Sequence, residues 1–239
     1  GKDAWPIEFE FGTAMDGDTE EHIIEVAKVL SGYVDMIAVR AFPKFIDWQE
    51  DRQDKVLNAF AKYATVPVIN METITHPCQE LAHILALQEH FGTRDLRGKK
   101  YLLTWTYHPK ALNTAVANSA LTIASRMGMD VTLLCPNDQY LLDERYMGWA
   151  ERNARESGGS VQVSHDIASA YAGADVVYAK SWGAPPGSGY GDSHTRQLPV
   201  DPPVAESVPL RLAVKPVAAR YVTPSKARSG RFPGSPGAT

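Results

Sequence analysis

The sequence predicts an α/β protein with two doubly wound parallel-sheet domains that are joined by a helix and are both incomplete. Short continuous apolar runs alternate with segments whose apolar residues recur every three or four positions, which is typical of parallel sheets covered by helices on both faces. One longer helical segment divides this alternation into two groups. The 239 residues, 44% of them hydrophobic, are enough for one large or two modest domains.

The first group opens without the strand and helix that normally begin such a unit. Asp18 and Glu21 form a capping-box pattern, which predicts the start of a helix that ends at Gly32. Arg40 stands at the carboxyl end of the first apolar run, and a polar loop covers residues 71–75. The predicted elements are a helix at 18–32, a strand at 36–39, a helix at 51–63 and a strand at 66–69.

The joining helix begins at Pro77, because proline suits the first turn of a helix, and it runs toward Gly92 with Leu81, Leu85 and Leu87 on its apolar face. The second group stops at its last recognisable strand. Its predicted elements are strands at 99–105, 131–135, 161–163 and 175–178, and helices at 113–128, 143–157 and 167–171.

The last 55 residues differ in kind from the rest. They hold seven Lys and Arg against three Asp and Glu, in a chain whose net charge is −4, and ten of its 16 prolines. Such a segment buries too little apolar surface to order itself, so we expect it to be disordered. We divide the chain at 1–79, 80–97 (the joining helix), 98–184 and 185–239.

Several classes of protein are excluded or disfavoured. The sequence has no apolar run of membrane-helix length and no signal-like start, so we expect a cytoplasmic protein without membrane contacts. Cys78 and Cys135 lack zinc-site spacing, which disfavours a metal centre. No Gly-x-Gly-x-x-Gly follows a strand, as a nucleotide-dependent dehydrogenase requires. The acidic body disfavours nucleic-acid binding.

Polar residues follow the predicted strands, where doubly wound sheets bind ligands. Together they supply an arginine, imidazoles, amides, a carboxylate and a lysine, which suit an anionic substrate and an amino acid. The residues are Arg40, Glu72, Thr75, His76, Gln79, Thr106, His108, Asn113, Lys180 and Ser181.

The stretch from Glu72 to Gln79 is the most specific of these. His76, held against Pro77, is placed to direct an imidazole N–H at a carbonyl oxygen that becomes negative during attack. The alternative interpretation is that His76 caps the helix and Gln79 is a solvated first-turn residue.

The sequence His76-Pro-Cys-Gln79 resembles the aspartate and ornithine carbamoyltransferases, which carry His-Pro-x-Gln between two α/β domains. The resemblance extends in order over residues 1–184. The segments at 2–8, 42–45, 104–110 and 180–183 are most similar to the family members that use N-acetylornithine in arginine synthesis, with ornithine as the alternative substrate. A homotrimer and no cofactor are implied.

The resemblance implies a role for each matching residue. His76 and Arg40 would be catalytic and polarise the carbonyl of carbamoyl phosphate, so residues 1–79 would be a carbamoyl-phosphate-binding domain and 98–184 an amino-acid-binding domain. The implied contacts of carbamoyl phosphate are Trp5, Arg40, His76, Pro77, Cys78 and Gln79, with Trp5 reaching a neighbouring subunit. The implied contacts of the amino-acid substrate are Glu20, Glu72, Asn113 and Lys180.

Two family motifs are missing. The sequence contains neither the Ser-x-Arg-Thr-Arg loop that cradles phosphate nor the His-Cys-Leu-Pro loop of the second domain. We therefore expect a truncated start, a shifted reading frame after Ala184 and impaired turnover. A non-catalytic oligomeric remnant is the alternative from a different functional class.

Overall fold

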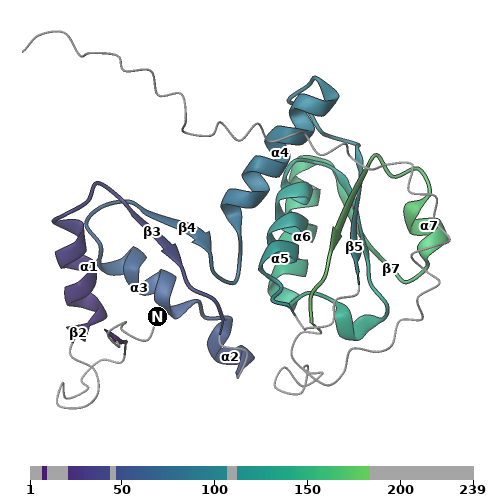
Figure 1. Ribbon diagram of the computed structural model, residues 1–239. Coiled ribbons are helices and arrows are strands. Elements are labelled where there is room, and N and C mark those ends of the chain that lie inside the picture. The colour runs from purple at the N-terminus through teal and green to yellow at the C-terminus, as the bar shows by residue number, and fades with distance from the viewer. Residues whose placement is uncertain (1–6, 10–20, 44–46, 107–111, 184–239) are drawn as a thin grey trace, which may run out of the picture.

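The computed structural model describes residues 7–9, 21–43, 47–106 and 112–183, and the statements below concern these residues. The fold is α/β with parallel strands, as the sequence predicts (Figure 1). The strands are β1 (Ile7–Glu8), β2 (Glu21–His22), β3 (Ile37–Arg40), β4 (Val68–Glu72), β5 (Lys100–Trp105), β6 (Asp130–Leu134), β7 (Ser160–Ser164) and β8 (Val176–Lys180). The helices are α1 (Ile23–Ser31), α2 (Trp48–Asp51), α3 (Lys55–Tyr63), α4 (Pro77–Phe91), α5 (Ala115–Arg126), the 3₁₀ turn η1 (Asp138–Tyr140), α6 (Glu144–Ser157) and α7 (Ile167–Tyr171).

The first group of elements forms two small parallel sheets, β1-β2 and β3-β4. The predicted helix at 18–32 starts later than expected, because residues 21 and 22 belong to β2 and the capping box is formed by His22 and Glu25. The predicted strand at 66–69 is displaced to 68–72, so Met71 and Glu72 are strand residues and not loop residues.

The predicted helix at 51–63 is two helices. Asp54 adopts a left-handed backbone with φ of 51°, which ends α2 and starts α3 on a new axis. Val56, Leu57 and Phe60 are half-buried, but Ala61 is exposed, contrary to its predicted inward position.

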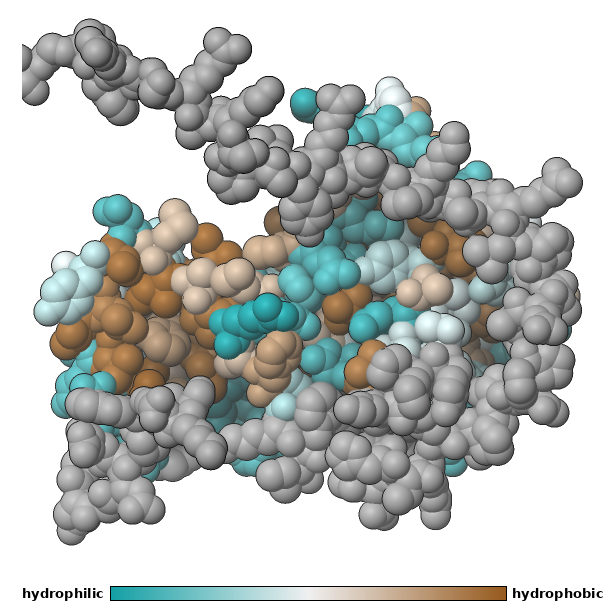
Figure 2. All heavy atoms as spheres, in the orientation of Figure 1, coloured by the Kyte–Doolittle hydropathy of each residue, from teal (hydrophilic) through white to brown (hydrophobic). Residues whose placement is uncertain are grey.

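One face of the β3-β4 sheet is open, although the sequence predicts cover on both faces. Ile37 and Val39 are buried, whereas Ile69 is 38% and Met71 43% exposed. Figure 2 shows hydrophobic side chains gathered at the surface in the region of α1 and this sheet.

Helix α4 connects the two groups of elements and contacts both β4 and α5. Pro77 occupies its first turn, and it ends at Gly92, whose φ of 65° suits glycine at a helix end. Residues 92–97, part of the segment assigned to the joining helix, are not helical. Leu87 is buried as predicted, but Leu81 and Leu85 are 62% and 56% exposed.

The second group forms a four-stranded sheet in the order β7-β6-β5-β8. Helices α5 and α6 pack together on one side of it and α7 lies on the other (Figure 1). The chain passes from β5 outward to β7 and then returns to the opposite side of β5 with β8. In doubly wound sheets, ligands bind at the carboxyl ends of the strands where the strand order reverses, which here are those of β5 and β8.

The largest hydrophobic core lies between this sheet, α4, α5 and α6. Leu103, Leu121 and Leu133 are fully buried in it, and Trp182 is 1% exposed. Among the described helices, none is long and apolar enough to cross a membrane.

Candidate functional site

The site begins where β3 and β4 end side by side. Arg40 and Glu72 are partners in the parallel register of these strands, and the Arg40 Nη2 atom lies 2.8 Å from Glu72 Oε2. The Glu72 side chain is 11% exposed, whereas that of Arg40 is 57% exposed. A nearly buried carboxylate therefore holds a guanidinium group that remains open to an anion from solvent.

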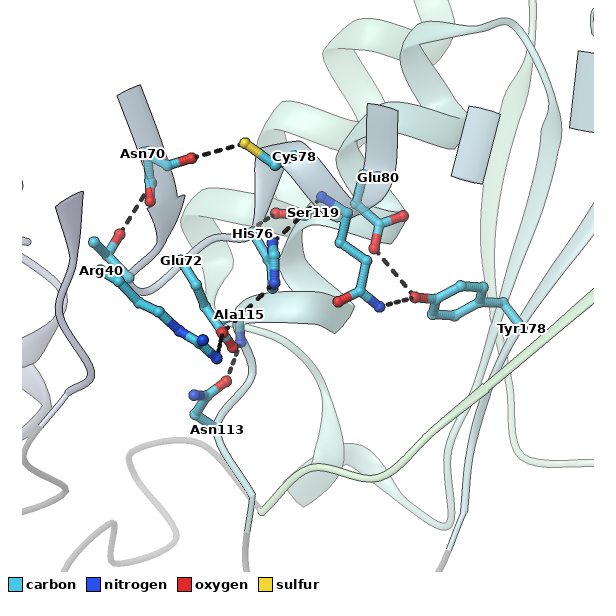
Figure 3. A network of polar contacts seen from close by, with 12 residues as sticks. Arg40, Asn70, Glu72, His76, Cys78, Glu80, Asn113, Ala115, Ser119 and Tyr178 are labelled. Carbon is cyan, nitrogen blue, oxygen red and sulfur yellow. Dashed lines mark hydrogen bonds and ion pairs between the residues drawn. The ribbon is translucent and has the colours of Figure 1, made fainter. Parts of the chain in front are cut away.

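His76 caps α4 and also faces the site (Figure 3). Its Nδ1 atom accepts from the backbone N–H of Gln79 at 3.3 Å, and its own backbone N–H donates to Ser119 Oγ at 2.7 Å. With Nδ1 accepting, neutral His76 carries its proton on Nε2, which lies 3.5 Å from Glu72 Oε2. The capping and site interpretations are thus compatible, because they use different nitrogens of one ring.

A polar network fixes the loop between β4 and α4. The Asn70 side-chain amide donates to Thr73 Oγ1 and Thr75 Oγ1, both at 3.0 Å. Thr73 in turn donates to Asp54 Oδ2 at 2.6 Å, and burial raises the pKa of this carboxyl above its usual range. From the other side, Asn118 donates to the Ile74 carbonyl at 3.1 Å. These residues, of which the sequence analysis singled out only Thr75, set the positions of Glu72 and His76.

The exposed side chain of Gln79 contacts Tyr178 of β8. Its Nε2 atom donates to the Tyr178 hydroxyl at 3.0 Å, and that hydroxyl donates to Glu80 Oε1 at 3.3 Å. Glu80 is 1% exposed, and its desolvation raises its pKa to about 7. Glu80 was also missed, although an acidic residue at helical spacing from Ile84 and Leu87 is a signal that the sequence offers.

The second group supplies Asn113 and Lys180. Asn113 Oδ1 accepts from the backbone N–H of Ala115 at 2.9 Å, so this residue caps the start of α5. Lys180 ends β8, and its carbonyl accepts from the Thr106 N–H at 3.1 Å. Lys180 pairs with Trp105, so the carboxyl ends of β5 and β8 lie side by side. Figure 3 shows Asn113 on the same side of the network as Arg40 and Glu72.

The other residues that the sequence analysis assigned to substrate binding lie at the start of α4 or outside the described residues. Pro77 forms the first turn of α4, and the exposed Cys78 thiol donates to the Asn70 carbonyl at 3.4 Å. Trp5, Glu20 and His108 lie outside the described residues. Among the residues that are described, no group of three or more His, Cys, Asp and Glu side chains is arranged to hold a metal ion.

The arrangement suits anion binding next to an electrophilic carbonyl. The Arg40 guanidinium and the His76 imidazole converge on one carboxylate oxygen, so both donors are directed at a single point of negative charge. Such converging donors stabilise a developing oxyanion. Ser119 does not change this interpretation, because its Oγ accepts a hydrogen bond from the His76 backbone N–H and the described structure places no base beside it.

Comparison with known proteins identifies the family. The family model "Aspartate/ornithine carbamoyltransferase, carbamoyl-P binding domain" matches residues 4–89, and "Aspartate/ornithine carbamoyltransferase, Asp/Orn binding domain" matches residues 110–186. The N-acetylornithine carbamoyltransferase of Xanthomonas campestris pv. campestris is 81% identical over 186 residues, which are 78% of this chain and 55% of the relative.

Solved structures agree with this assignment. A mutant of N-acetyl-L-ornithine transcarbamylase, complexed with carbamyl phosphate and N-succinyl-L-norvaline, matches with a TM-score of 0.75 at 81% identity, over 77% of this chain and 55% of that one. Acetylornithine transcarbamylase complexed with acetylcitrulline matches with a TM-score of 0.77 at 78% identity, over 80% and 58%. The chain spans about 55% of the length of the curated relatives it matches. Sequence motif, site geometry and both family models agree, and the chain belongs to the aspartate/ornithine carbamoyltransferase family.

Proposed function

We propose that this chain moves the carbamoyl group of carbamoyl phosphate to the δ-amino group of N-acetylornithine, a step of arginine synthesis. The convergence of Arg40 and His76 on Glu72 Oε2 is the observation that carries the proposal, since those two donors would meet the carbonyl oxygen of carbamoyl phosphate. The identity to N-acetylornithine carbamoyltransferases supports N-acetylornithine over ornithine as the acceptor.

In the proposed reaction, the lone pair of the δ-amino nitrogen attacks the carbamoyl carbon. The carbon–oxygen bond to phosphate then breaks, phosphate leaves with the electron pair, and the nitrogen gives up a proton that ends on the departing phosphate. Arg40 and the Nε2–H of His76 stabilise the negative oxygen, so the protein contributes positioning and charge stabilisation. No resident cofactor takes part in this scheme.

The two groups of elements divide the proposed binding work. Residues 1–79 hold carbamoyl phosphate, with Pro77, Cys78 and Gln79 at the start of α4 contributing the next contacts. Residues 98–184 hold the amino acid, because Lys180 pairs with its carboxylate and Asn113 contacts it. Glu72, from residues 1–79, also contacts the amino acid. Trp5 and Glu20 are assigned to the site from the family resemblance alone.

The second candidate function is a non-catalytic module that retains the family's assembly. We propose a cytoplasmic homotrimer in either case.

Carbamoyl transfer to N-acetylornithine, ornithine and aspartate tests the proposal, with His76→Asn as the decisive variant. Asparagine is a good helix cap, so this substitution preserves the start of α4 while removing the Nε2–H. We expect N-acetylornithine to be the preferred acceptor and His76→Asn to lose transfer with its melting temperature unchanged. Tyr33→Phe is the control, since this tyrosine is 81% exposed.

Transfer that survives in His76→Asn would contradict the assigned role of the imidazole, and a preference for ornithine would contradict the assigned acceptor. Trimers in light scattering combined with no transfer by the unsubstituted chain would select the non-catalytic module.

A further inference from the structure

A polar cluster that is only partly buried contacts the first turn of α4. It joins Gln79 and Glu80 of α4 to Tyr178 of β8, and continues through His83 to Tyr101 of β5. The Tyr101 hydroxyl is 3.2 Å from His83 Nε2, and the His83 and Tyr178 rings are in edge contact with their centroids 4.6 Å apart. Tyr178 is the only member of this cluster that contacts the Gln79 side chain within the described structure.

The hydroxyl of Tyr178 determines which way the Gln79 amide faces. A tyrosine hydroxyl has one proton to donate, and here that proton goes to the carboxylate oxygen Oε1 of Glu80. The oxygen of Tyr178 can then only accept from Gln79, so it must meet the nitrogen end of the amide. The other end, Oε1, is left as an acceptor at the start of α4.

The connection also spans the two groups of elements. Tyr178 is two positions before Lys180 in the same strand, so its side chain couples the first turn of α4 to the strand that carries the proposed carboxylate partner. Glu80 is held firmly behind it, at 1% exposure, and its Oε2 atom has no hydrogen-bond partner in the described structure. Among the residues that the structure describes, Tyr178 is therefore the one side chain that hydrogen-bonds this buried carboxylate, and it connects the carboxylate to Gln79.

We propose that Tyr178 is a positioning residue that, together with Glu80, orients the Gln79 amide so that its Oε1 accepts a hydrogen bond from the amino group of carbamoyl phosphate. This inference rests on the proposed function, because it deepens the role assigned to Gln79. The carbamoyl amino group has two N–H donors. Acetyl phosphate has a methyl group in their place and is otherwise similar in shape and charge, so selectivity between the two ligands reports the orientation of the amide.

Calorimetric titration of the full chain with carbamoyl phosphate and with acetyl phosphate, at pH 8.5, tests the proposal. At that pH Glu80 is ionised, since its pKa is about 7. We expect the unsubstituted chain to prefer carbamoyl phosphate and Tyr178→Phe to reduce this preference roughly 10-fold, the effect of one well-placed hydrogen bond. Glu80→Gln should reduce it in the same direction, and the exposed-tyrosine variant Tyr33→Phe should leave it unchanged.

The variant Gln79→Ala separates positioning from a general structural effect. If Tyr178 acts through Gln79, the double variant Gln79→Ala/Tyr178→Phe has the same selectivity as Gln79→Ala alone. A further loss of selectivity in the double variant would overturn the proposal, and so would an unchanged preference in Tyr178→Phe.

A second measurement distinguishes failure of this inference from failure of the proposed function. A chain that binds neither ligand contradicts the proposed function, and hydrogen exchange of the Gln79 side-chain amide, followed by NMR, then decides the inference. Protection that is present in the unsubstituted chain and in Tyr33→Phe, but lost in Tyr178→Phe, supports the assigned orientation. Exchange at the rate of a free amide in the unsubstituted chain overturns it.

Discussion

Trp48 donates its indole N–H to Asp143 Oδ2 at 2.9 Å, across 95 positions of the chain. The tryptophan, in α2, is 4% exposed, and the aspartate, which caps α6, is 8% exposed. Asp143 Oδ1 also accepts from the backbone of Arg145 at 2.9 Å and lies 3.2 Å from Arg52. The first group of elements is therefore fastened to the second at a point other than α4.

Replacing Trp48 by phenylalanine tests the strength of this link. The substitution keeps most of the apolar burial but removes a donor to a nearly buried carboxylate, and a hydrogen bond to a charged group contributes about 1.5–3 kcal/mol. We expect the free energy of unfolding to fall by about that amount in denaturant titrations followed by circular dichroism. Trp149→Phe is the matched control, because Trp149 is 42% exposed. Equal losses in the two variants would show that the indole N–H of Trp48 is not the cause.

The βα alternation, the start of α4 at Pro77 and its end at Gly92 were predictable, because they depend on local spacing and on the special backbones of proline and glycine. The break at Asp54 was not, because the helical apolar pattern continues across it while the left-handed backbone of that single residue redirects the chain. The late start of α1 has a similar cause, since His22 and Glu25 provide a second capping box that competes with the one predicted at Asp18 and Glu21.

The candidate site was predictable only where residues follow strand ends. Arg40, Glu72 and His76 converge because β3 and β4 are parallel neighbours, and such strands bring their carboxyl ends together. The roles of Tyr178 and Ser119 could not be predicted from the sequence, because their contacts at the start of α4 join positions 99 and 43 residues apart and depend on how the helix packs. The exposure of Leu81 and Leu85 likewise follows from tertiary packing and not from helical periodicity.

The raised pKa of Glu80 predicts that the stability of the fold falls as pH rises, which is the reverse of the usual effect of a carboxyl group. Burial raises its pKa from 4.5 to about 7 in the folded chain, so between these values the folded state binds more protons than the unfolded state. Its ionisation therefore destabilises the fold as pH rises through this window, by an amount on the order of 3 kcal/mol. In Glu80→Gln the unfolding free energy should lose this decline between pH 5 and pH 8.

The control for this prediction is Glu89→Gln, an exposed residue on the same helix. Unfolding free energies measured in urea at several pH values should follow the unsubstituted chain in Glu89→Gln and diverge from it in Glu80→Gln. Parallel curves for all three proteins would mean that Glu80 is not desolvated in solution.

The lowered pKa of His83 predicts that the stability of the fold falls as pH decreases. Burial lowers its pKa from 6.5 to about 4, so between these values the unfolded state binds more protons than the folded state. The chain therefore loses stability as pH falls from 6.5 to 4, and His83→Gln should remove this loss. NMR titration offers a direct check, because the ring signals of His83 should stay in the neutral form at pH 5. His90→Gln, an exposed position on the same helix, should retain the acid-dependent loss.

The two cysteines should differ sharply in reactivity toward a disulfide reagent at pH 8. Cys135 is 2% exposed, and burial raises the pKa of its thiol to about 11, so almost no thiolate is present. His165 Nδ1, although 3.9 Å from the sulfur, donates to the Cys135 carbonyl at 2.8 Å and so is not free to remove the thiol proton. Cys78 is exposed. We expect one thiol per chain to react rapidly with the reagent, and we expect this reaction to be absent in Cys78→Ser. The second thiol should react only in denaturant. A rapidly reacting thiol that persists in Cys78→Ser would contradict the burial of Cys135.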